Sequence, residues 1–194
     1  MSTLFRDLLG AAFDELPEPV RRFHMLDLER FTSGRSMVAR PETFGARLLS
    51  WIAGLPAPGV NLETSVRFTP LARNREYWRR NFAGRRYRSI MEAATDGRLI
   101  EHFGPFDLYF ALTPSARGLR WSLREWRLLK FPLPKRSTPS VECLETAEGD
   151  AFVFDIDVVF PLIGSVVHYA GALQDADDAA ARRESSVRPL PLLP

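Results

Sequence analysis

Apolar side chains recur along this chain at two different periods. Before residue 60 the spacing is that of amphipathic helices, and from Val66 onward apolar and polar positions alternate as in half-buried strands. The first part predicts three short helices and a short strand over residues 36–40. The second part predicts a long run of strands.

Caps and prolines delimit the three predicted helices. The first lies between a cap at Ser2 or Thr3 and a stop at Leu16-Pro17. The second begins near Pro19, because proline is tolerated in a first helical turn. The third follows Pro41 and ends at Gly54. Their apolar faces are formed by Leu4, Phe5, Leu8, Leu9, Ala12 and Phe13 in the first, by Val20 and Phe23 in the second, and by Phe44, Leu48, Trp51, Ile52 and Leu55 in the third.

The strands predicted after residue 66 are separated by turn residues about every ten positions, which is typical of an up-and-down meander. An open sheet of this size would leave edges and an apolar face uncovered, and closure into a barrel removes both problems. The predicted fold is therefore mainly β (α+β): an antiparallel up-and-down meander closing into a β-barrel, with N-terminal helices and an internal pocket. The predicted strands are residues 66–71, 76–82, 85–93, 98–103, 106–112, 118–129, 140–147, 152–160 and 163–173.

Two other pocket folds compete with the barrel. A helix-grip fold needs a long amphipathic C-terminal helix, but residues 175–187 are mostly Ala, Asp, Arg, Glu and Ser. A cone-shaped fold with early helices on a curved sheet fits the helix order better but normally uses fewer strands, so it is the second choice. Residues 1–173 are predicted to form a single domain and residues 174–194 a flexible C-terminal tail.

Charge and cysteine content narrow the functional class only slightly. The 26 basic and 24 acidic residues nearly cancel, so the pI near 9.0 reflects a small surplus rather than a polycation. The single cysteine, Cys143, leaves no internal disulfide to form, and there is no signal-peptide pattern or apolar run of ~20 residues. We expect a cytoplasmic protein without a membrane span.

Charged residues on predicted apolar faces are the candidates for chemistry. Alternation predicts that the barrel interior holds Arg80, Glu101, Glu125, Arg127 and His168. Desolvation raises the pKa of such a carboxylate and a nearby arginine lowers it, so the group can be tuned for proton transfer. The competing interpretation is structural: Glu125 and Arg127 form a buried ion pair that fixes strand register, and His168 is a hydrogen-bonded strand histidine.

Residues 67–88 are the best candidate for nucleic-acid binding. They contain eight arginines against one acid, Glu76, with Trp78, Phe82 and Tyr87 interleaved. Alternation places much of this charge on outward faces, where acids of neighbouring strands can pair with it, so nucleic acid is not the predicted partner. Glycine-rich nucleotide loops, a Gly-x-Ser-x-Gly elbow and His or Cys pairs at metal-ligand spacing are missing from the sequence, so no cofactor and no metal are expected.

Four stretches carry a family resemblance. They are the run Trp78 to Ser89, the run Glu101 to Pro105, Gly118 to Trp121 together with Pro132 to Pro134, and Phe154 to Gly171. With the first predicted helix, they resemble a bacterial family known only as domain of unknown function number 4166. The family brings no known catalytic residues, and relatives joined to a nicotinamide-dependent oxidoreductase domain imply small-molecule metabolism. The chain departs from the family pattern at Lys130-Phe131, where a glycine is usual, and at Ala172, where an aromatic residue is common.

The sequence thus predicts a pocket for a small, mostly apolar molecule. The first hypothesis is a cofactor-independent cyclase or isomerase of a biosynthetic pathway, with Glu101 or Glu125 as acid/base. The side chains predicted to bind the substrate are Trp78, Arg80, Trp121, Arg127, His168 and Tyr169. The second hypothesis is a non-catalytic ligand-binding or carrier barrel, and the third is a partner subunit of a separate oxidoreductase. A homodimer is the candidate assembly.

Overall fold

Short helices and one long strand precede the meander in the computed structural model, which describes residues 3–52 and 55–176. Helix α1 spans Leu4–Leu9 and gives way to a 3-10 helix over Gly10–Glu15, because Gly10 adopts a positive φ of 56° that ends the α-helical turn. Helix α2 spans Glu18–His24 with a proline in its first turn, and α3 spans Phe44–Ile52. The predicted second and third helices are confirmed, and the first is divided in two. The predicted cap at Gly54 lies outside the described residues.

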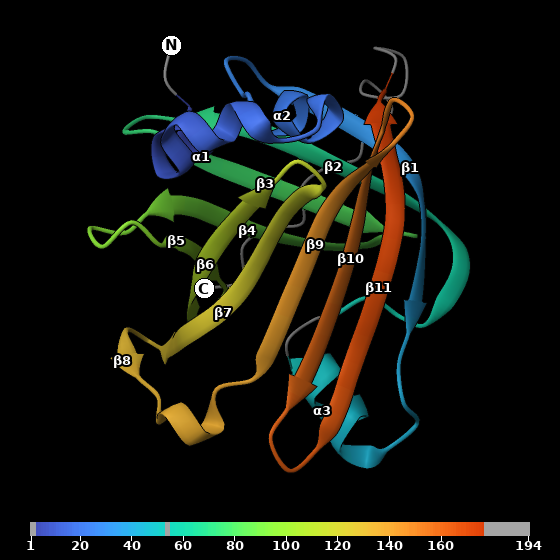
Figure 1. Cartoon of the computed structure of the whole chain (residues 1–194). Coiled ribbons are helices and arrows are strands. Elements are labelled where there is room, and N and C mark those ends of the chain that lie inside the picture. Colours follow the sequence, from blue (N-terminus) through green and yellow to red (C-terminus); the bar gives the residue numbers. More distant parts are fainter. Residues whose placement is uncertain (1–2, 53–54, 177–194) are drawn as a thin grey trace.

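The strands follow one another in chain order around a closed antiparallel barrel (Figure 1). Each strand pairs with the next, β7 pairs directly with β9, and β11 returns to β1, so ten strands of the described chain form the wall. The two-residue strand β8 only extends the end of β7. This closure confirms the predicted up-and-down barrel and excludes an open, cone-shaped sheet. The bounds are β1 Arg30–Ala39, β2 Gly59–Leu71, β3 Arg75–Phe82, β4 Arg85–Ala93, β5 Leu99–Phe103, β6 Phe106–Ser115, β7 Gly118–Leu128, β8 Phe131–Pro132, β9 Ser140–Glu148, β10 Ala151–Phe160 and β11 Gly164–Asp175.

Strand β1 is longer than the predicted segment of residues 36–40. Its inward positions Thr32 and Ser36 are buried but polar, so the apolar alternation that reveals a strand is hidden there. Thr32 Oγ1 donates to the Val66 carbonyl at 3.2 Å, and the hydroxyls of Ser36 and Thr64 are hydrogen-bonded at 2.6 Å. At the other end of the chain, β11 continues past residue 173, and the predicted tail lies outside the described residues from residue 177 on.

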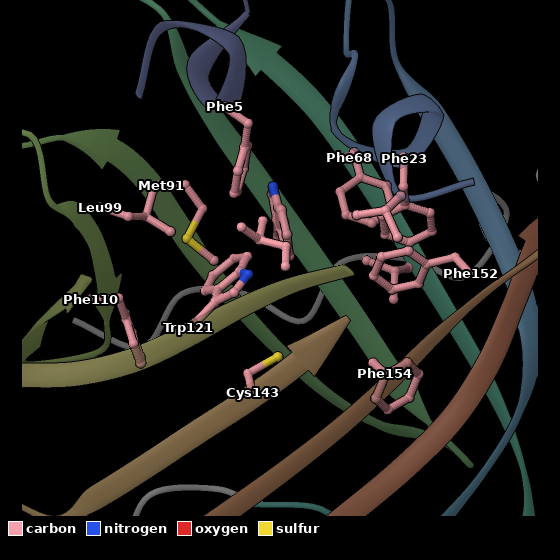
Figure 2. Packing of buried hydrophobic residues seen from close by; sticks show 14 of the residues in the cluster. Phe5, Phe23, Phe68, Met91, Leu99, Phe110, Trp121, Cys143, Phe152 and Phe154 are labelled. Atoms are coloured by element: carbon pink, nitrogen blue, oxygen red, sulfur yellow. The ribbon is translucent and has the colours of Figure 1, made fainter. Parts of the chain in front are cut away.

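Helices α1 and α2 cover one end of the barrel (Figure 1). Phe5 and Phe23 of these helices are buried and enter an aromatic core with residues from strands on opposite sides of the barrel, as Figure 2 shows. The rings of Phe23 and Phe152 stack with their centroids 3.6 Å apart, and Phe5 lies 5.4 Å from Trp121. This end, which we call the α1/α2 end, is therefore filled by side chains.

Helix α3 lies at the opposite end of the barrel, beside the β10–β11 turn (Figure 1). Ala46 and Ser50 of this helix are buried, whereas Phe44, Leu48 and Trp51 point to solvent. Its short residues and Leu49 thus face the barrel, and the apolar face formed by Phe44, Leu48 and Trp51 is turned outward. We call this end the α3 end.

A β-bulge in β7 reverses the facing of that strand's second half. Tyr109 of β6 pairs with Glu125, but the next residue, Phe110, pairs with Leu123, so Arg124 is an extra residue with no partner position on β6. Before the bulge Trp121 and Leu123 point inward, and after it Trp126 does. Side chains after Arg124 therefore lie on the face opposite to the one that strict alternation predicts.

Candidate functional site

The barrel encloses a cavity of about 320 Å³ between the aromatic core and the α3 end. Side chains from α2, α3 and most barrel strands line it, and they are mainly aromatic or aliphatic. Only a few of the lining residues contribute polar atoms to the cavity wall. The main polar residues in the lining are Arg80, Tyr87, Glu101, Cys143, Glu145 and Tyr169. A mostly apolar cavity with a few polar groups is the usual form of a small-molecule site.

Arg80 and Glu101 form an ion pair in the cavity wall. Arg80 comes from β3, where the inward positions are Trp78, Arg80 and Phe82, and Glu101 comes from the inward face of β5. Nη1 of Arg80 donates to Glu101 Oε1 at 3.1 Å and to Ser89 Oγ at 2.7 Å. Burial opposes the charge on Arg80, but the Glu101 carboxylate outweighs it and raises the pKa of the guanidinium.

Part of the Arg80 guanidinium remains available to a ligand. Its hydrogen bonds to described residues both leave from Nη1, so Nε and Nη2 donate to no acceptor in the described part of the chain. Both side chains of the pair are 14% exposed, and both line the cavity. Arginine carries five N–H donors, so the remaining ones can reach an oxygen of a bound molecule.

Two tyrosines lie beside this ion pair. The Arg80 guanidinium lies 5.6 Å from the ring centroid of Tyr87, and Tyr169 of β11 lines the same part of the wall. Burial raises the pKa of Tyr87 to about 12 and the pKa of Tyr169 well above its ordinary value. Both hydroxyls are therefore neutral near pH 7. The Tyr87 hydroxyl interacts with that of Tyr169, and the indole N–H of Trp126 is buried without a hydrogen-bond partner among the described residues.

Three residues predicted for the interior lie on the outer face instead. Glu125 and Arg127 follow the β7 bulge, so the prediction from strict alternation is wrong for both. Arg127 Nε donates to Glu125 at 2.8 Å, Arg98 donates to the same carboxylate at 3.1 Å, and the hydrogen bond from Arg127 is the main cause of the lowered pKa of Glu125. A carboxylate held ionised on the outer wall is not placed to act on a ligand in the cavity.

His168 is the third misplaced residue. In β11 the side chains that line the cavity are Val166, Tyr169 and Leu173, and His168 faces outward to Asp155, with Nε2 to Oδ1 at 3.2 Å. Both faces of this strand carry small or apolar residues, so its sequence did not show which face is buried. Gly171 decides the facing, because a Cβ there would lie 2.9 Å from the Phe154 ring inside the barrel.

The two predicted tryptophans lie at the inner limit of the cavity, beside buried acids that the sequence analysis did not select. Trp121 Nε1 donates to Glu145 Oε2 at 3.0 Å, and the same oxygen is 2.8 Å from Nε2 of His24. Trp78 Nε1 donates to Glu76 Oε2 at 2.9 Å. Glu76 and Glu145 alternate with inward apolar neighbours, and this pattern could have revealed them.

This buried network ties the α1/α2 end to the barrel. His24 belongs to α2, is fully buried and stacks on Phe5 at 3.8 Å between ring centroids, while its partner Glu145 belongs to β9. Hydrogen bonds between buried polar groups are strong in a low-dielectric interior, so the network fixes α2 on the wall. Burial also raises the pKa of Glu76 to about 7, against the opposing effects of His24 and Trp78.

Other classes of site find little support in the described residues. Arg67 and Arg79 of the arginine-rich stretch both pair with Glu29, at 2.6 and 3.7 Å, and Arg80 points inward, so the stretch is not one continuous basic face. Across the described residues, no group of three or more His, Cys, Asp or Glu side chains could hold a metal ion. Nor do they include a helix of the length and apolarity needed to cross a bilayer.

Comparison with known proteins gives one match. The model of a family described as Domain of unknown function (DUF4166) matches residues 16–173, which include α2, α3 and the barrel strands almost to the end of β11. No curated protein and no solved structure matches this chain.

Proposed function

The chain belongs to the DUF4166 family, whose function is unknown. From the geometry of the barrel we propose that it binds one small, mostly apolar and uncharged molecule in its cavity. The observation that carries this proposal is Arg80, an arginine in an apolar cavity with N–H donors left over after its pairing with Glu101. Glu101 already neutralises its charge, so the donors suit a carbonyl or hydroxyl oxygen better than an anion.

Binding can be measured with Nile red, an uncharged apolar dye that bears a carbonyl. The native chain should bind it with a blue-shifted and brighter emission, because the dye leaves water for an apolar cavity. The double variant Arg80→Gln/Glu101→Gln removes the guanidinium without leaving a buried unpaired carboxylate. We expect about fivefold to tenfold weaker binding, as for the loss of one or two hydrogen bonds.

Two further variants complete the Nile red experiment. Arg79→Gln changes the neighbouring residue of β3, half exposed on the outer wall, and should leave the affinity unchanged. Val158→Trp fills the cavity and should abolish binding. Equal dye binding by native chain, double variant and Val158→Trp would show that the dye sits elsewhere and would contradict the proposal.

A second candidate function is cofactor-independent cyclisation or isomerisation of the bound molecule. Glu101 favours it, because its carboxylate lies in the cavity beside Arg80 and two neutral tyrosines. In an isomerisation, Glu101 would take a proton from a carbon next to a carbonyl and return it to another carbon, while Arg80 stabilises the enolate oxygen. The proton that leaves one carbon is returned to another, so this isomerisation involves no oxidation or reduction and needs no cofactor.

Glu101→Gln separates catalysis from binding. Incubated with an extract of apolar metabolites, the native chain should shift the chromatographic retention of one compound without changing its mass, and Glu101→Gln should not. Glu125→Gln, on the outer wall, is the matched control and should behave as native. Conversion by Glu101→Gln at the native rate, or no conversion by the native chain, would leave binding as the only function proposed.

A further inference from the structure

The α3 end presents large apolar side chains to solvent on several separate segments. Phe44 and Trp51 of α3 are 81% and 74% exposed, Phe131 of β8 is 75% exposed, and Leu162 of the β10–β11 turn is fully exposed. These segments lie together at one end of the barrel (Figure 1). We call the set the mouth surface: Phe44, Leu48, Trp51, Leu129, Phe131, Leu162 and Ile163. Large exposed apolar side chains gathered at one end of a molecule mark an interaction site more often than singly scattered ones do.

Basic residues lie at the same end of the barrel as the mouth surface. Arg40, Arg47 and Arg85 border a shallow hollow on the outer side of α3, together with Phe44, Leu48 and Trp51. The segments that connect elements at this end (residues 39–52, 55–60, 83–86, 103–106, 128–139 and 159–165) carry seven basic residues and one acid, Glu42. The whole chain has a net charge of only +2, so the positive charge is concentrated here. The partner should therefore be both apolar and anionic.

The mouth surface also lies directly outside the cavity. Leu49 of α3 and Leu55 after it line the cavity, while Phe44, Leu48 and Trp51 on other sides of the helix are exposed. Phe160, next to the β10–β11 turn, and Leu133, which follows β8, belong to the cavity lining as well. Helix α3 and the neighbouring turns thus separate the cavity from whatever covers the mouth surface.

From these observations we propose that the mouth surface docks on an anionic lipid bilayer. A short helix with exposed Phe, Leu and Trp and flanking arginines is suited to the headgroup region, where the rings enter the acyl boundary and the cations meet phosphates. Docking in this orientation places the part of the cavity lined by Leu49, Leu55 and Phe160 next to the membrane, with α3 and the neighbouring turns between them. The consequence that an apolar ligand passes between bilayer and cavity rests on the proposed binding function; the docking itself does not.

A second copy of the chain is a poorer occupant of this surface. Two mouth surfaces facing each other would bring two sets of surplus positive charges together, and like charges juxtaposed at an interface are unfavourable. An anionic bilayer supplies both an apolar layer and the opposite charge.

The direct test is sedimentation of the full chain with vesicles of phosphatidylcholine alone and of phosphatidylcholine with one third phosphatidylglycerol. We expect binding to the anionic vesicles, weakened by high salt, and little binding to the neutral ones. Trp51 provides a site-specific readout, because Trp78 and Trp121 are buried and Trp126 faces the cavity. Its emission should shift to the blue on binding, and Trp51→Phe should lose most of that shift.

Paired variants identify the surface. Arg40→Glu/Arg47→Glu and Phe44→Ser/Leu162→Ser should each weaken vesicle binding about tenfold or more, since each basic residue near an anionic surface contributes about fivefold. The controls Arg117→Glu and Leu28→Ser alter exposed residues at the α1/α2 end and should bind as native. Three results would each overturn the proposal. The first is equal binding to neutral and anionic vesicles, and the second is an equal loss of binding in the controls. The third is a dimer, detected by sedimentation analysis, that dissociates in the variants of the mouth surface. Nile red binding by the same variants is measured separately, so failure to dock and failure to bind a ligand are distinguishable.

Discussion

At the scale of single residues, the interior contains acids in two different electrostatic situations. Glu101 has an arginine partner, whereas Glu76 is 2% exposed and receives a hydrogen bond only from the Trp78 indole among described residues, with its Oε1 unpartnered. Burial favours the protonated form of Glu76 and raises its pKa to about 7, against the smaller opposing effects of His24 and of the Trp78 hydrogen bond. Glu76 is therefore a cost to stability at neutral pH.

Substitution of Glu76 should reveal this cost. Between about pH 4.5 and 7 the unfolded chain releases the Glu76 proton while the folded chain keeps it, so the free energy of unfolding falls as the pH rises through this window. Glu76→Gln retains an acceptor for Trp78 and cannot ionise. We expect it to stabilise the protein at pH 8, by on the order of 2 kcal/mol, and to have little effect at pH 4. Urea denaturation at the two pH values measures the difference.

Glu29→Gln is a control of opposite sign. Burial raises the pKa of Glu29, but hydrogen bonds from Thr69 and Arg67 outweigh burial and lower it overall. This carboxylate stabilises the fold above its unfolded pKa and loses that effect as the pH falls. Its substitution should therefore destabilise the protein at pH 8, and stabilisation there by both variants would contradict the electrostatic explanation.

At the scale of elements, two local departures from regular pattern decide what faces the cavity. One extra residue, Arg124, moves Glu125 and Arg127 to the outer wall and brings Trp126 inward. In α3, small residues pack against the barrel and aromatic residues face outward. The first departure reduces the acid/base candidates of the cavity wall to Glu101, Glu145 and the adjoining Glu76. The second creates the mouth surface.

At the scale of the whole molecule, the barrel closes where β1 meets β11, the strands farthest apart in the sequence. Gly34 permits this contact, since a Cβ there would lie 1.9 Å from the carbonyl oxygen of Ala172. Gly171 does the same from the other strand, where a Cβ would lie 2.5 Å from the Arg35 carbonyl oxygen. Closure thus depends on glycines that let two backbones approach closely.

Gly34→Ala should destabilise the closed barrel. The added methyl group must displace the backbone of β11, because the atom it meets is not a flexible side chain. We expect a loss of about 2 kcal/mol or more in the free energy of unfolding, as for overpacking elsewhere. Thermal unfolding followed by circular dichroism measures the loss. Ser33→Ala, the adjacent position of β1, should have a small effect, and an unchanged melting temperature for Gly34→Ala would contradict the role given to this contact.

The sequence alone determined most of the strands after Val66, their antiparallel order and the closure into a barrel. Alternation from Val66 onward and turns at short intervals leave few other arrangements of so many strands. It also placed Arg80 and Glu101 on inward faces, because neither β3 nor β5 has a register shift in its pairings. The alternation of inward and outward side chains repeats within a single strand, so it predicts the inward residues without knowledge of the neighbouring strand.

Only the tertiary structure decided the facing of Glu125, Arg127 and His168, the hydrogen bond between Glu145 and His24, and the outward side of α3. A bulge is defined by the partner strand, a buried hydrogen bond joins residues more than a hundred positions apart, and the covered side of a helix depends on what it packs against. These features depend on contacts between distant segments, and the order of residues within one segment does not contain them.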